Sequence, residues 1–144
     1  MKVSQLSVFI ENKSGRLADV TRALADAKIN IRALSIADTI DYGLLRLIVN
    51  DPVAARNALA GAGFTVTLTD VLAIVVPDKP GGLAGIIDIL AGTGINIEYM
   101  YAFAEKRGDR ALLVFRFSNP DAALQVLKTG GINPVGTLEL FSRA

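Results

Sequence analysis

Apolar residues along the chain change their spacing in a fixed order. Over residues 3–10 they alternate with other side chains, which predicts a strand. The next ones recur every three or four positions, which predicts one buried face of a helix: Leu17, Val20, Leu24 and Ala27. Two segments, 31–40 and 43–50, then predict a hairpin, followed by a short helix after Asp51-Pro52 and a strand over about 64–68.

The second half of the chain has the same order of patterns. A continuous apolar run over 71–76 predicts a strand, and the next apolar residues share a helical face: Leu83, Ile86, Ile87 and Leu90. A hairpin is predicted over about 97–105 and 110–118, and a short helix after Asn119-Pro120. A last strand is predicted from Ile132 to about Phe141.

The two halves also align residue by residue. An offset of 66 places residues 12–18 over 78–84, and 29–31 over 95–97. After the hairpin the offset becomes 68, which one insertion of two residues explains. Turn residues and apolar positions that match in order indicate a duplication, so we predict two modules, 1–69 and 70–144.

The order βαββαβ, present twice, predicts an α+β fold of two ferredoxin-like modules, each an antiparallel four-stranded sheet with two helices on one face. The other face would then be open. Four positions that would point to it are nevertheless apolar: Leu44, Ile48, Leu112 and Val114. We therefore expect another sheet or subunit to cover part of that face, and we expect a homodimer.

Composition narrows the possible functions. The 144 residues include 15 Lys plus Arg, 14 Asp plus Glu, and no Cys or His, so thiolate and imidazole chemistry are absent. We expect no enzyme activity, no cofactor and no metal site. No apolar run approaches the ~20 residues that span a bilayer, so we expect a cytoplasmic protein with no membrane partner.

The second half carries a recognisable motif, Asp78-Lys79-Pro80-Gly81-Gly82-Leu83 followed by Gly94-Ile95-Asn96-Ile97. With the strand order, it resembles the ACT domain, an amino-acid-binding regulatory module of many enzymes of amino-acid metabolism. The first half is similar but has Ser14 where the family often has proline, and Ile10 where some serine-binding members have histidine. The resemblance implies a free-standing tandem ACT protein that binds an amino acid between modules and regulates a separate partner enzyme by allostery.

The turn that opens the first helix of each module suits that ligand. Unpaired N–H groups at a helix start, here those of residues 15–17 and 81–83, attract a carboxylate. Side chains near the turn can accept hydrogen bonds from the ammonium group. The predicted ligand-binding residues are Asn12, Ser14, Gly15, Arg16, Leu17, Asn30, Asp78, Pro80, Gly81, Gly82, Leu83 and Asn96.

Each of these residues also has a purely structural reading. Gly15 and Gly81 can serve the turn alone, Asn12 and Asp78 can cap the helix, and the asparagines at 30 and 96 can end the preceding one. Their joint occurrence in both modules favours a site. Asp78 makes the second module the better candidate, because charge-assisted hydrogen bonds are stronger.

Three other functions compete with amino-acid sensing. RNA-recognition modules share the strand order, and Tyr99, Tyr101 and Phe103 lie on one strand, but Phe115 and Phe117 occupy helix-facing positions and a net charge of +1 attracts phosphate weakly. An enzyme would rely on carboxylates that show no paired spacing: Asp19, Asp26, Asp38, Asp41 and Asp70. A regulatory subunit that holds an enzyme without a ligand of its own remains the alternative.

Overall fold

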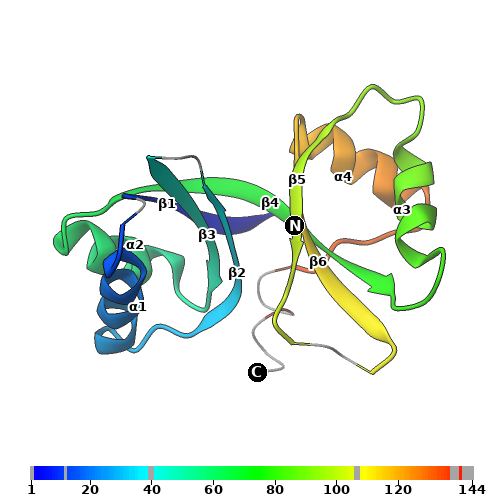
Figure 1. Cartoon of the computed structure of the whole chain (residues 1–144). Coiled ribbons are helices and arrows are strands. Elements are labelled where there is room, and N and C mark those ends of the chain that lie inside the picture. Colours follow the sequence, from blue (N-terminus) through cyan, green and yellow to red (C-terminus); the bar gives the residue numbers. More distant parts are fainter. Residues whose placement is uncertain (1, 12, 39–40, 106–107, 137–139, 141–144) are drawn as a thin grey trace. The chain divides into compact units, whose positions relative to one another are not determined.

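A computed structural model of the chain describes residues 2–11, 13–38, 41–105, 108–136 and 140. The chain divides into two compact units, one formed by Ser4–Thr69 and the other by Met1–Val3 with Asp70–Ala144. In each unit two helices cover one face of the strands (Figure 1). Among the described residues, no helix is long and apolar enough to cross a membrane.

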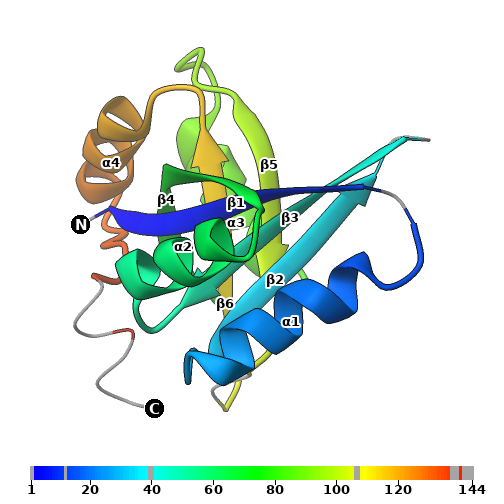
Figure 2. The ribbon, with the colours of Figure 1, turned by 90° about the vertical axis from the view of Figure 1, so that its left-hand side faces the viewer.

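The first unit contains the predicted series of elements in order. They are β1 (Val3–Glu11), α1 (Arg16–Asp26), β2 (Ile31–Asp38), β3 (Tyr42–Val49), α2 (Pro52–Gly61) and the first part of β4 (Thr65–Pro77). Strand β3 pairs antiparallel with both β1 and β2, with Leu6 opposite Leu47. Helix α1 runs back along these strands, from the turn after β1 to the start of β2 (Figure 2).

The second unit repeats most of this series. The rest of β4 is followed by α3 (Gly82–Leu90), β5 (Ile97–Ala102), β6 (Arg110–Phe117) and α4 (Pro120–Thr129). Strand β6 pairs antiparallel with both β4 and β5, with Leu72 opposite Phe115. The α+β class and the order of elements up to α4 therefore agree with the prediction.

The prediction of two separate four-stranded sheets is wrong. The described strands form one six-stranded sheet in the order β2-β3-β1-β4-β6-β5. The segments 64–68 and 71–76 were expected to be two strands, but no glycine or proline separates them and they form the single strand β4. One long strand thus belongs to both units.

The prediction of a last strand, from Ile132 to about Phe141, is also wrong for the residues of that range that the structure describes. Between Ile132 and Gly136 only Val135 pairs, through an isolated bridge to Ala73. The N–H of Leu140 donates to the carbonyl of Gly136 at 2.9 Å, a spacing of four residues that is typical of a helix. Residues 137–139 and 141 lie outside the described part of the chain.

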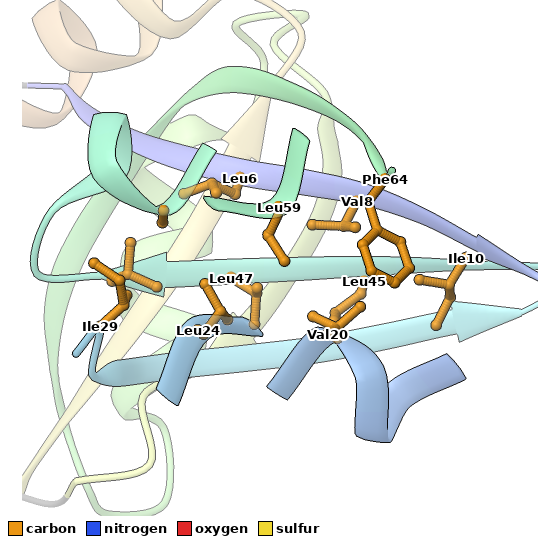
Figure 3. Packing of buried hydrophobic residues seen from close by; sticks show 12 residues of the cluster. Leu6, Val8, Ile10, Val20, Leu24, Ile29, Leu45, Leu47, Leu59 and Phe64 are labelled. Atoms are coloured by element: carbon orange, nitrogen blue, oxygen red, sulfur yellow. The ribbon is translucent and has the colours of Figure 1, made fainter. Parts of the chain in front are cut away.

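The core of each unit lies between its helices and strands, as the periodicity predicts. Figure 3 shows the first core, where Leu6, Val8 and Ile10 of β1 pack with Val20 and other apolar residues of α1, β3 and α2. On the other face of the strands Ile48, Leu112 and Val114 are buried and Leu44 is half-buried. Those four positions are therefore shielded from solvent to different degrees.

Candidate functional site

The two strand-to-helix turns have the same backbone conformation. Gly15 (φ 91°, ψ −16°) and Gly81 (φ 84°, ψ −8°) are both left-handed and stand at the N-cap of α1 and α3. Such values favour glycine because a Cβ is strained there. The requirement for glycine in the turn is therefore structural in both modules.

Each turn already uses one of its predicted N–H groups. The N–H of Arg16 donates to the carbonyl of Lys13 at 3.4 Å, and the N–H of Gly82 donates to the carbonyl of Lys79 at 3.0 Å. Since the first turn of a helix has no intrahelical acceptor four residues back, the N–H groups of Leu17 and Leu83 are among those that the helix geometry leaves for a ligand.

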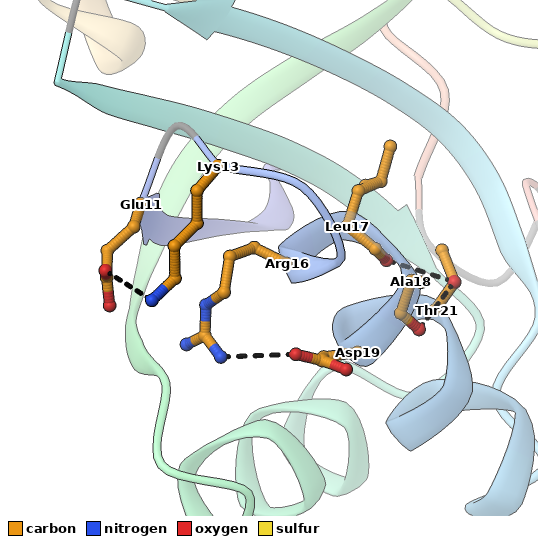
Figure 4. A network of polar contacts seen from close by, with 7 residues as sticks. All are labelled: Glu11, Lys13, Arg16, Leu17, Ala18, Asp19 and Thr21. Atoms are coloured by element: carbon orange, nitrogen blue, oxygen red, sulfur yellow. Dashed lines mark hydrogen bonds and ion pairs between the residues drawn. The ribbon is translucent and has the colours of Figure 1, made fainter.

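Side chains around the first turn interact with one another (Figure 4). Lys13 pairs with Glu11 at 3.1 Å, and Arg16 pairs with Asp19 at 3.2 Å. The hydrogen bond and charge of Lys13 lower the pKa of the Glu11 carboxyl below its ordinary value. The Arg16 guanidinium also lies 4.5 Å from the ring centroid of Phe64, in a cation–π contact. This turn is filled by its own residues.

The second turn borders an open groove of about 780 Å³. Its walls are formed by the turn, by the α3 face with Gly85, Ile86 and Ile89, and by residues from the β6 start and the α4 end: Asp109, Arg110, Gly131 and Ile132. The ammonium of Lys79 and the guanidinium of Arg110, which both line the groove, form no ion pair with any described residue.

Only two of the predicted residues, Gly81 and Gly82, line this groove. Asp78 lies beside it, exposed, with its backbone N–H donating to the carbonyl of Asp109 at 2.8 Å. Leu83 and the equivalent Leu17 are exposed apolar side chains outside it. Pro80 and Ser14 are exposed parts of the turns, and Asn12 lies outside the described residues.

Asn30 and Asn96 lie at the far end of the first helix of their modules. The N–H of Asn30 donates to Oδ1 of Asn50 at 3.1 Å, and the N–H of Asn96 donates to Oγ of Ser118 at 3.0 Å. An 11-residue helix such as α1 is about 16 Å long, so it separates Asn30 from Gly15. A ligand that contacted an asparagine and a turn would have to lie between modules or between copies, and the joint role of these residues stays a prediction.

Sequence reasoning did not single out the groove residues Lys79, Asp109, Arg110 and Ile132. The alignment of the two halves carried a signal for them. It places Gly82 opposite Arg16 and Ile132 opposite Phe64, so the second module loses two large side chains at one location. Residue type alone could not show that these positions are close in space.

The structure argues against the RNA-binding alternative. Phe115 and Phe117 are fully buried and their rings are stacked on each other, with centroids 5.6 Å apart. They are not available to stack on bases. For metals, the described part of the chain has no cluster of three or more Asp or Glu residues that could hold an ion.

Comparison with known proteins agrees with the architecture. A family model described as "ACT domain pair" matches residues 1–141. Protein BT0572 from Bacteroides thetaiotaomicron has 45% identity and a TM-score of 0.91, with 98% of this chain and 96% of that chain covered. The ligand-free regulatory subunit of aspartate kinase from Thermus thermophilus has 23% identity and a TM-score of 0.61, with 88% and 91% covered, which shows a common fold. No curated protein matches the chain significantly.

Proposed function

Because the chain belongs to the ACT domain pair family, we propose that it is an amino-acid-sensing regulatory protein that modulates a separate partner enzyme of amino-acid metabolism. The observation that carries this proposal is the pair of turns with matching left-handed glycines at the start of α1 and α3. Helices that begin this way direct free N–H groups and partial positive charge to one point, which suits a carboxylate.

The second turn is the stronger site in this proposal. Asp78 offers a carboxylate to the ligand's ammonium, where the first module has Asn12. A charge-assisted hydrogen bond is roughly twice as strong as a neutral one. Asn96 joins the site when the ligand lies between modules or between the two chains of a homodimer.

Regulation follows if the ligand binds one arrangement of modules better than another. The effect on the partner cannot exceed the ligand's differential affinity for the two arrangements, typically ~1–3 kcal/mol. The fold shared with the aspartate kinase regulatory subunit from Thermus thermophilus supports an enzyme as partner.

Thermal shift and isothermal titration of the full chain against the twenty amino acids test the sensing function. We expect one ligand, or a few related ones, to raise the melting temperature of the wild type. Asp78→Ala and Asn96→Ala should weaken that response. Asp26→Ala and Asn57→Ala, which remove exposed side chains of the same types from α1 and α2, are the matched controls and should leave it unchanged.

The alternative is a regulatory subunit that has no ligand of its own. A wild-type chain that responds to no amino acid would support this alternative and contradict the sensor. Rate measurements on a co-purified enzyme, with and without the ligand, then test whether binding changes activity.

A further inference from the structure

The groove beside α3 exists because the second module lacks side chains that occupy the same place in the first. The alignment of the modules replaces Glu11, Arg16, Asp19 and Phe64 by Pro77, Gly82, Gly85 and Ile132. In the first module these four residues and Lys13 are joined by two ion pairs and one cation–π contact. The second module keeps the lysine, as Lys79, but it has Pro77 at the position of Glu11, the carboxylate with which Lys13 pairs.

The walls of the groove combine charge with an apolar surface. Lys79 and Arg110 offer two cations that have no ion-pair partner among the described residues, and Asp109 offers a carboxylate. Three isoleucines line the space between α3 and the chain after α4: Ile86, Ile89 and Ile132. The volume of about 780 Å³ lies within the range of small-molecule sites.

We infer that this groove binds an α-amino acid with an apolar side chain, and that it is the only one of the two equivalent locations open to a ligand. The ligand's carboxylate lies at the start of α3 and pairs with Lys79 and Arg110, its ammonium pairs with Asp109 and the neighbouring Asp78, and its side chain packs against the isoleucines. The inference rests on the proposed sensing function and names both the class of ligand and the surface that selects it.

The stacking of Arg16 on Phe64 accounts for the difference between the modules. A guanidinium over an aromatic ring, held also by Asp19 at 3.2 Å, occupies the place where a ligand's side chain would lie. The cation of Lys13 is neutralised by Glu11. We therefore expect one ligand per chain at this kind of site.

Isothermal titration of the full chain with leucine, isoleucine and phenylalanine tests the inference, with glycine and aspartate as comparison ligands. We expect at least one apolar amino acid to bind more tightly than the comparison ligands, with one ligand per chain. Lys79→Ala should weaken that binding by roughly tenfold or more, since it removes a charge-assisted hydrogen bond. Lys13→Ala, the equivalent change in the first module, is the control and should have no effect.

Filling the groove gives a second test. A Cβ at Gly85 meets no atom within 4 Å, so Gly85→Leu should fold while its side chain enters the groove and abolishes binding. Ala84→Leu places the same side chain ~100° around α3, at an exposed position that does not line the groove, and should bind as the wild type does. Circular dichroism melting checks that both variants are folded.

The outcomes separate this inference from the sensing function. An amino acid that binds the wild type, Gly85→Leu and Lys79→Ala equally well would overturn the groove as its site and leave the sensor intact. Tight binding of aspartate alone would overturn the inference that the ligand has an apolar side chain. Two ligands per chain would overturn the inference that the first module is closed to a ligand. No binding of any amino acid to the wild type would overturn both proposals.

Discussion

The carbonyl oxygen of Pro77, the last residue of β4, lies directly against Gly82, the first residue of α3. A Cβ at position 82 would overlap that oxygen. The first module has Arg16 at the equivalent position. The close approach of strand and helix in the second module therefore depends on glycine, and the same glycine leaves the groove open.

Gly82→Ala should lower the free energy of unfolding by about 1–3 kcal/mol, because the added methyl group forces β4 and α3 apart. Gly85→Ala is the matched control in the same helix. Its Cβ meets no atom within 4 Å, so it should be neutral or stabilise by up to ~1 kcal/mol. Urea denaturation of both variants measures the difference. Equal stabilities would contradict the overlap at position 82.

Arg16→Ala should lower the free energy of unfolding by about 0.5–2 kcal/mol, because it removes the cation–π contact with Phe64 and the pair with Asp19. Arg22→Ala, which changes an exposed arginine of the same helix, should have little effect. Chemical denaturation compares the two. If Arg22→Ala costs as much as Arg16→Ala, the contact with Phe64 contributes nothing measurable.

The pKa of the Glu11 carboxyl should rise toward its ordinary value of 4.5 in Lys13→Ala, since the hydrogen bond and the charge of Lys13 lower it. A carboxyl whose pKa is lower in the folded chain adds stability above its unfolded pKa and loses it as the pH falls through the folded pKa. The variant should therefore lose a small part of its stability above about pH 4.5. The difference from the wild type should disappear as the pH falls through the folded pKa of Glu11. NMR titration of the Glu11 carboxyl carbon measures the shift.

Lys128→Ala is the control for that titration, because Lys128 lies in the last turn of α4 and is not among the groups that shift Glu11. It should leave the pKa of Glu11 unchanged. A Glu11 pKa that stays low in Lys13→Ala would show that another group lowers it.

Asp51→Ala and Asn119→Ala should each lower the free energy of unfolding by about 0.5–2 kcal/mol. Each side chain accepts a hydrogen bond at 3.1 Å from a backbone N–H in the first turn of its helix, Ala54 for α2 and Ala122 for α4. Asn57→Ala, in the exposed middle of α2, should not destabilise the chain. Urea midpoints of the three variants test this. A cap variant as stable as the wild type would mean that water replaces the side chain without cost.

Sequence patterns predicted the features that depend on neighbours within a few residues. The caps Asp51 and Asn119 and the glycine turns at 15 and 81 were all expected from local chemistry, and the structure adds that both glycines are left-handed. The candidate site was predicted less completely. The turns were expected, but Lys79 and Arg110 come from segments about 30 residues apart that meet only in the fold.

By itself, the sequence determined the order of helices and strands up to α4 and the glycine turns, because helical and strand periods and caps are local properties of the backbone. Only the tertiary structure decided that β4 is one strand in a six-stranded sheet. It also decided that the first turn is closed, because Arg16 stacks on Phe64 there. The second turn is open because Gly82 and Ile132 stand at the equivalent positions. These outcomes depend on contacts between residues far apart in the chain, whose energies no local pattern encodes.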